Sequence, residues 1–119
     1  MITLNIDYEK AIDFGHIDDL HEAGRKLSEL TNLLNRVISV RHRTKQDIIL
    51  ECAKFPENKP HKLSWENKLV MLLQASPSSS DMVNLYSQAD EAYIKIRNKQ
   101  SQVLEDLMAL KKIIDTTPR

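Results

Sequence analysis

The sequence predicts an all-α fold: a long antiparallel helical hairpin of coiled-coil character, with a short helix between its two arms. One early stretch carries apolar residues at alternating steps of three and four, the spacing of a heptad seam: Leu20, Ala23, Leu27, Leu30, Leu34 and Val37. A late stretch repeats this spacing: Met82, Leu85, Ala89, Ala92 and Ile96, then Val103, Leu107, Leu110 and Ile114. With two glycines and 5% aromatic residues in 119, the composition also suits helix seams better than a thick globular core.

These patterns divide the chain into five segments within one expected helical domain, residues 1–119. The segments are an N-terminal arm over 1–16, a long helix over 17–53, a connector over 54–63, a short helix over 64–75 and a second long helix over 80–115. The first long helix contains a polar interruption from Arg41 to Asp47. Because no Gly or Pro lies in this interruption, a single helix can continue through it.

The expected helix boundaries have local causes. Asp18 and Asp19 would lie in the first turn of the long helix, where negative charge complements the helix dipole. The two prolines of the connector stop that helix, because proline lacks the amide donor that a helix interior needs. Ser64 can cap the short helix, and Ser78 with Asp81 has the spacing of a capping box before the last helix.

Charge favours the antiparallel orientation. Residues 1–35 carry three basic and seven acidic residues, whereas residues 36–68 carry eight basic and four acidic ones. If the chain folds back between Lys54 and Ser80, the basic run that begins at Arg41 lies opposite Asp90 and Glu91. Exposed ion pairs contribute only about 0.2–1 kcal/mol each, so they select the orientation more than they hold the helices together.

Two helices alone cannot cover all the apolar side chains that flank their seams. We therefore expect a homodimer that completes a four-helix bundle, or the capture of a partner helix. The residues expected at such an interface are Leu27, Leu30, Leu34, Val37, Tyr86, Tyr93, Leu104 and Met108.

Several kinds of chemistry have no support in the sequence. The two glycines are isolated, so a glycine-rich phosphate loop is absent, and the single cysteine, Cys52, lies in an apolar stretch typical of a buried structural thiol. The acidic start of the long helix, from His16 to Glu22, has spacing that could ligate a divalent metal. However, Lys111 and Lys112 are expected opposite it, so a solvated helix start is the preferred interpretation. We expect neither catalysis nor a metal or other cofactor.

The sequence therefore predicts a non-enzymatic protein-interaction module, such as an adaptor, an inhibitor or an assembly chaperone. Its partners would be itself and another protein, and with no apolar run long enough for a membrane span we expect a cytoplasmic location. The alternative is an accessory nucleic-acid-binding protein that uses the basic middle segment, residues 36–68. Trp65 would then stack on bases rather than anchor the short helix. The candidate nucleic-acid contacts are Arg41, Arg43, Lys45, Lys62, Arg97 and Lys99.

Overall fold

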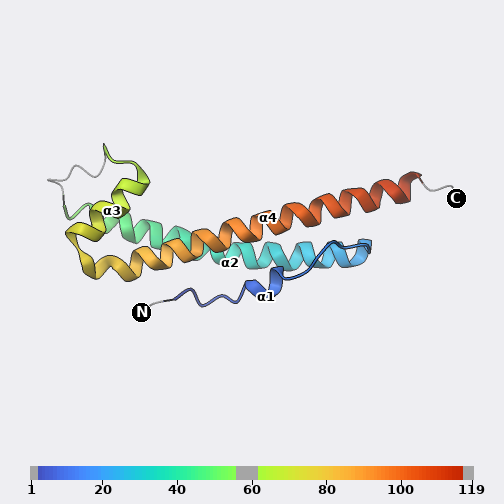
Figure 1. Cartoon of the computed structure of the whole chain (residues 1–119), viewed down its shortest axis with the longest axis horizontal. Helices are drawn as coiled ribbons and strands as arrows, with labels where there is room; N and C mark the ends of the chain where they lie inside the picture. Colours follow the sequence, from blue (N-terminus) through green and yellow to red (C-terminus); the bar gives the residue numbers. More distant parts are fainter. Residues whose placement is uncertain (1–2, 56–61, 117–119) are drawn as a thin grey trace. The chain divides into compact units, whose positions relative to one another are not determined.

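The computed structural model describes residues 3–55 and 62–116, most of which are helical, with no strand among them. The helices are α1 (Glu9–Ile12), α2 (Leu20–Cys52), α3 (Trp65–Ala75) and α4 (Ser80–Thr116), with a 3₁₀ turn, η3 (Pro77–Ser79), just before α4. The long helices α2 and α4 pack against each other in a hairpin-like arrangement (Figure 1). The all-α prediction is therefore confirmed. Residues 56–61 of the predicted connector lie outside the described residues.

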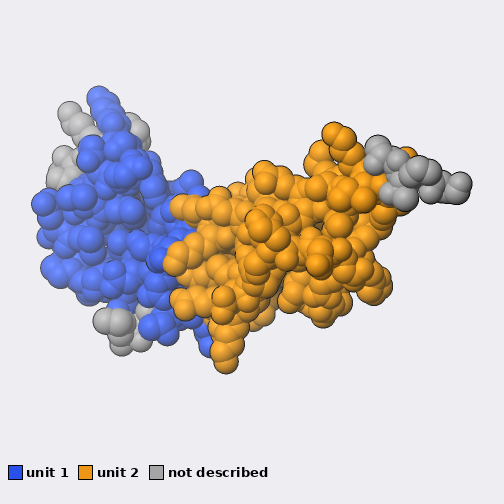
Figure 2. Space-filling view, turned by 45° about the vertical axis from the view of Figure 1, so that its right-hand side comes forward, with its two compact units in different colours: residues 1–5, 38–91 blue, residues 6–37, 92–119 orange. Residues whose placement is uncertain are grey.

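The chain divides into two compact units, coloured separately in Figure 2. Unit 1 comprises residues 1–5 and 38–91, and unit 2 comprises residues 6–37 and 92–119. Both long helices pass from one unit into the other, so each unit contains a part of α2 and a part of α4. That residues 1–119 form a single domain stays a prediction.

Helix α2 runs through the predicted polar interruption without a break over its 33 residues. Thr44 occupies a buried position there, and its hydroxyl donates a hydrogen bond to the Val40 carbonyl at 2.8 Å. That bond satisfies the hydroxyl within its own helix, so burial leaves no polar atom unpaired. Arg41 donates from Nε to Asp90 of α4 at 2.9 Å, which confirms the charge pairing that the sequence predicted.

The core of unit 1 gathers where α3 packs on the ends of the two long helices. Its buried members are Ile48, Cys52, Leu72, Val83 and Tyr86, with Phe55, Trp65, Leu69, Met71 and Met82 packed partly buried against them. The Trp65 and Tyr86 rings meet edge to face, with centroids 5.1 Å apart. Trp65 thus anchors the short helix on this core. Tyr86, which was expected at an interface, is part of this core.

The helix starts differ in detail from those expected. Helix α2 begins at Leu20 rather than residue 17, because Asp19 is its capping residue and accepts a hydrogen bond from the Glu22 amide at 3.0 Å. The Ser64 cap of α3 is confirmed by a 3.3 Å bond from the Asn67 amide. Before α4, the Ser78 hydroxyl lies 3.2 Å from that of Ser76, and η3 leads directly into the helix.

In unit 2 the arm before α2 is mostly irregular and includes only the single turn of α1. Tyr8 is its buried side chain. Residues 3–6 are also irregular. Further along, Phe14 lies between two lysines, with the Lys26 ammonium 5.0 Å and the Lys99 ammonium 4.2 Å from the ring centroid. The arm is therefore docked on both long helices rather than extended into solvent.

Candidate interaction surface

The predicted interface residues fall into three groups once the chain has folded. Leu30, Leu34, Val37 and Tyr86 are buried within the chain and form part of its core. Leu27 and Tyr93 are half-buried. Leu104 and Met108 remain exposed, with 42% and 69% of their surface accessible. Within the predicted set, these last two side chains of α4 are the ones that the folded chain leaves exposed.

Leu104 and Met108 belong to a continuous stripe along α4. Steps of four and three residues place six exposed side chains on one face of the helix. We call this set the α4 outer face: Arg97, Ser101, Leu104, Met108, Lys111 and Asp115. Its centre is apolar and its ends are charged, which is the usual layout of a helix-packing surface.

The α4 outer face points away from the core because other sides of the helix are held by contacts within the chain. Ile96 and Val103 are fully buried in unit 2. On a neighbouring side, Lys99, Gln102 and Asp106 follow the same three-and-four spacing and bind the arm. Because the helix is held on these two sides, Leu104 and Met108 cannot turn inward without breaking those contacts. Their exposure is therefore built into the fold.

Most of the hydrogen bonds between α4 and the arm involve main-chain atoms of the arm. The Lys99 ammonium donates to the Phe14 carbonyl, and the Gln102 amide donates to the Gly15 carbonyl at 3.1 Å. Asp106 accepts a hydrogen bond from the Ile17 amide at 3.1 Å, and its other oxygen lies 3.0 Å from His16 Nδ1. The hydrogen bond from the Ile17 amide lowers the pKa of Asp106 below its ordinary value, and the contact with His16 lowers it further by a smaller amount.

Sequence reasoning missed these arm-binding residues. In the sequence, residues 97–102 are a polar stretch between Ile96 and Val103 of the second seam. A polar run on the inward side of an amphipathic helix is itself a signal, since buried or half-buried polar groups need partners. That signal could have pointed to a segment packed at this position. It could not have identified the arm as that segment, because main-chain acceptors carry no sequence pattern.

The six basic residues considered for nucleic-acid binding are differently engaged. Arg41 pairs with Asp90, and the Lys45 ammonium lies 5.1 Å from the centroid of the Trp65 ring. Lys99 holds the arm. Three of the six therefore already contact other parts of the chain, and Trp65 packs against Tyr86. The exposed candidates are Arg43, Lys62 and Arg97, and nucleic-acid binding stays a prediction.

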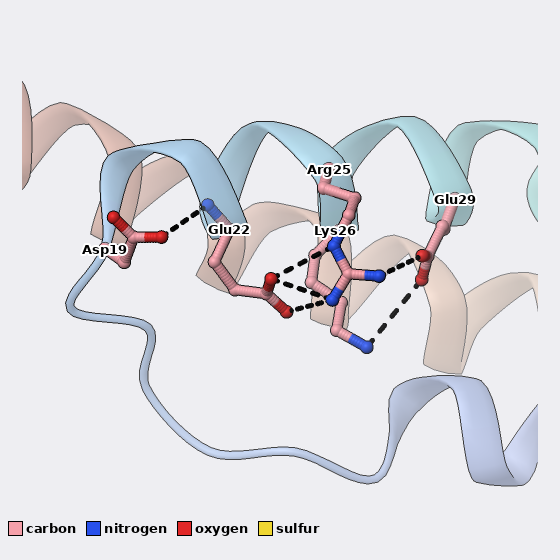
Figure 3. Close-up of polar contacts among 5 residues, drawn as sticks. All are labelled: Asp19, Glu22, Arg25, Lys26 and Glu29. Carbon is pink, nitrogen blue, oxygen red and sulfur yellow. Dashed lines mark hydrogen bonds and ion pairs between the residues drawn. The ribbon is translucent and has the colours of Figure 1, made fainter.

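The acidic start of α2 is arranged as a set of ion pairs rather than as a ligand cluster (Figure 3). Arg25 bridges Glu22 at 2.6 Å and Glu29 at 3.1 Å, and the hydrogen bond with Glu22 raises the Arg25 pKa above its ordinary value. Asp19 serves as the helix cap. Across residues 3–55 and 62–116, no three His, Cys, Asp or Glu side chains are grouped so that they could hold a metal ion.

Cys52 is the buried thiol that the sequence predicted, with 2% of its surface accessible. Burial raises its pKa above the ordinary value, because the thiolate loses solvation in the unit 1 core. A thiol held protonated is a poor nucleophile. Cys52 therefore acts as a small apolar residue in the packing of α2 against α3.

Comparisons with known proteins identify no relative. No protein-family model, curated protein or solved structure matches this chain. No helix in the described residues is both long enough and apolar enough to span a bilayer.

Proposed function

We propose that this protein is a non-enzymatic helical interaction module, an adaptor, inhibitor or assembly chaperone, that binds a partner helix through the α4 outer face. The observation that carries the proposal is the exposure of Leu104 and Met108, one turn apart on a helix whose inward sides are buried or bind the arm. Single exposed apolar side chains are common on protein surfaces. Two of them one turn apart, with charged residues at both ends of the same helix face, form a surface on which a partner helix can pack.

The chemistry of this face suits a helix rather than a small molecule. Moving such a side chain fully out of water is worth about 1.5–3 kcal/mol. Because Leu104 and Met108 are 42% and 69% exposed, covering them would contribute about half and about two thirds of that range. Met108 adds adaptability, because its unbranched thioether can repack against differently shaped neighbours. Lys111 and Asp115 are exposed beside this apolar centre and provide charges of both signs for choosing an orientation.

A photo-crosslinking amino acid placed at position 108 tests the proposal directly. Ala109 is the matched control, because it is also exposed but points about 100° around the helix from Met108. In cells that produce the protein naturally, we expect a discrete adduct from position 108 and none of comparable yield from position 109. The adduct should disappear when Leu104→Glu is added. Equal labelling from both positions, or no adduct at all, would contradict the proposal.

A further inference from the structure

We propose that the α4 outer face binds a second copy of itself, with the two α4 helices antiparallel about a two-fold axis near residue 106. This inference rests on the proposed function and names the partner. In this register Leu104 of one chain packs against Met108 of the second copy. By symmetry, Met108 of the first chain packs against Leu104 of the second copy. The same symmetry places Arg97 opposite Asp115 of the second copy at both ends.

The register follows from the order of residue types along the face. Six exposed side chains at steps of four and three read basic, polar, apolar, apolar, basic and acidic from Arg97 to Asp115. In an antiparallel pair, an a position of one helix packs against a d position of the other. The apolar pair at the centre of the face therefore packs against the same pair of the second copy, with Leu104 opposite Met108. The apolar side chains then meet each other and the two ends meet with opposite charges.

Charge selects this orientation over the parallel one. A parallel pair in register would place Arg97 beside the Arg97 of the second copy, and likewise align Lys111 with Lys111 and Asp115 with Asp115. Three like-charge contacts oppose that arrangement. The antiparallel pair replaces two of them with attractive contacts between Arg97 and Asp115, and sets Lys111 against the uncharged Ser101. A self-complementary patch of this kind is what a two-fold dimer requires.

The paired face is short, so the dimer is expected to be weak. From Arg97 to Asp115 it extends about 27 Å at 1.5 Å per residue, with apolar contacts only in its two central layers. Glu105 works against pairing, because it flanks the face and the two copies of it approach near the two-fold axis. Replacing this charge should therefore strengthen the dimer, which is a feature specific to this register.

Sedimentation of the full-length protein from about 10 µM to about 1 mM tests the inference. We expect the mass to rise from one chain to two with concentration. Met108→Glu should leave a monomer at every concentration, because it would bury a charge against Leu104. Ala109→Glu, one residue away and equally exposed, should leave the dimer unchanged. Helical content measured by circular dichroism should be the same in both variants, since neither residue is buried.

A charge exchange tests the register itself. Arg97→Glu and Asp115→Arg should each weaken the dimer by about 10-fold, because each removes two exposed ion pairs and introduces two repulsive contacts. Combining the two substitutions should restore the wild-type dissociation constant. Glu105→Gln should tighten the dimer by several-fold. Failure of the combined variant to recover, or loosening by Glu105→Gln, would overturn the antiparallel register.

The outcomes separate this inference from the proposed function. If the wild-type protein stays monomeric at about 1 mM while position 108 still forms a discrete adduct with a different protein, the self-pairing is wrong and the interaction module stands. If there is neither a dimer nor an adduct, both proposals fail. A dimer that Met108→Glu leaves intact would show that the chain associates through another surface, which also overturns the inference.

Discussion

Gly24 lies on an exposed turn of α2, and no described atom beyond its own helix backbone and chain neighbours lies within 4 Å of where a Cβ would stand. Since the space is open within the chain, Gly24→Ala should raise the free energy of unfolding by about 0.8–1 kcal/mol, the difference in helix propensity. Urea denaturation measures this directly. A destabilised variant would contradict the open position of Gly24 in the fold.

Asp106 binds residues 16 and 17 of the arm through one carboxylate, and its removal should loosen these two residues. Asp106→Ala removes the acceptor of the Ile17 amide and the partner of His16. We expect hydrogen exchange at the Ile17 amide to accelerate in this variant. Asp106→Asn keeps an oxygen that can accept from the same amide, so its exchange should be intermediate. Unchanged exchange in Asp106→Ala would mean that the arm is held without this residue.

The same carboxylate gives the arm a pH dependence with a defined sign. Hydrogen bonds to the charged form lower the pKa of Asp106 in the folded chain, while in the unfolded chain it should be about 3.9. Its contribution to arm docking is therefore fully present above about pH 3.9 and is lost as the pH falls through the lower folded value. The amide chemical shift of Ile17, followed during acidification, should report that loss. Asp106→Asn should abolish the transition.

At the scale of elements, Leu72 decides whether α3 is docked. It is fully buried in the unit 1 core, whereas Val70 on the same helix is 52% exposed. Leu72→Ala should lower the free energy of unfolding by about 2–5 kcal/mol, because it leaves a cavity between α3 and the long helices. Val70→Ala should change it by less than about 0.5 kcal/mol. Similar effects of the two changes in denaturation experiments would contradict the docking.

Trp65 of α3 has a buried polar group that forms no hydrogen bond in the described residues. This group is the indole N–H. The ring nevertheless contributes its edge-to-face contact with Tyr86 and the nearby Lys45 ammonium. An aromatic body that packs well on both sides can outweigh one unsatisfied donor, whose cost is about 1–3 kcal/mol.

The elements could be predicted because helix signals are local. Heptad spacing marked α2 and α4, and the Arg41 pairing with Asp90 followed from charge order along the two helices. The core register of α4 was harder to predict, since Val83 and Tyr86 are buried where Met82 and Leu85 were expected. Neighbouring apolar residues give the same periodicity, and only the position of α3 decides which of them faces inward.

At the scale of the whole molecule, the contacts between distant segments were the part that sequence could not supply. The docking of residues 14–17 depends on main-chain carbonyls and amides that bind Lys99, Gln102 and Asp106. Such groups are present at every position of a chain and form no motif. The sequence predicted that apolar side chains would remain uncovered, and the structure leaves such side chains exposed on α2, α3 and α4. Leu30, Leu34 and Val37 of the predicted interface are buried inside the chain, whereas Leu104 and Met108 are exposed.

The methionine methyl groups allow the most direct test of the central claim that the α4 outer face meets a partner. Met71 and Met82 pack in the unit 1 core, while Met108 lies at the centre of the outer face. In protein labelled with ¹³C at the methionine methyls, the Met108 signal should shift or broaden when a dilute sample is concentrated or mixed with native cell extract. The Met71 and Met82 signals should stay in place. A Met108 signal that is identical in all these conditions would contradict the account.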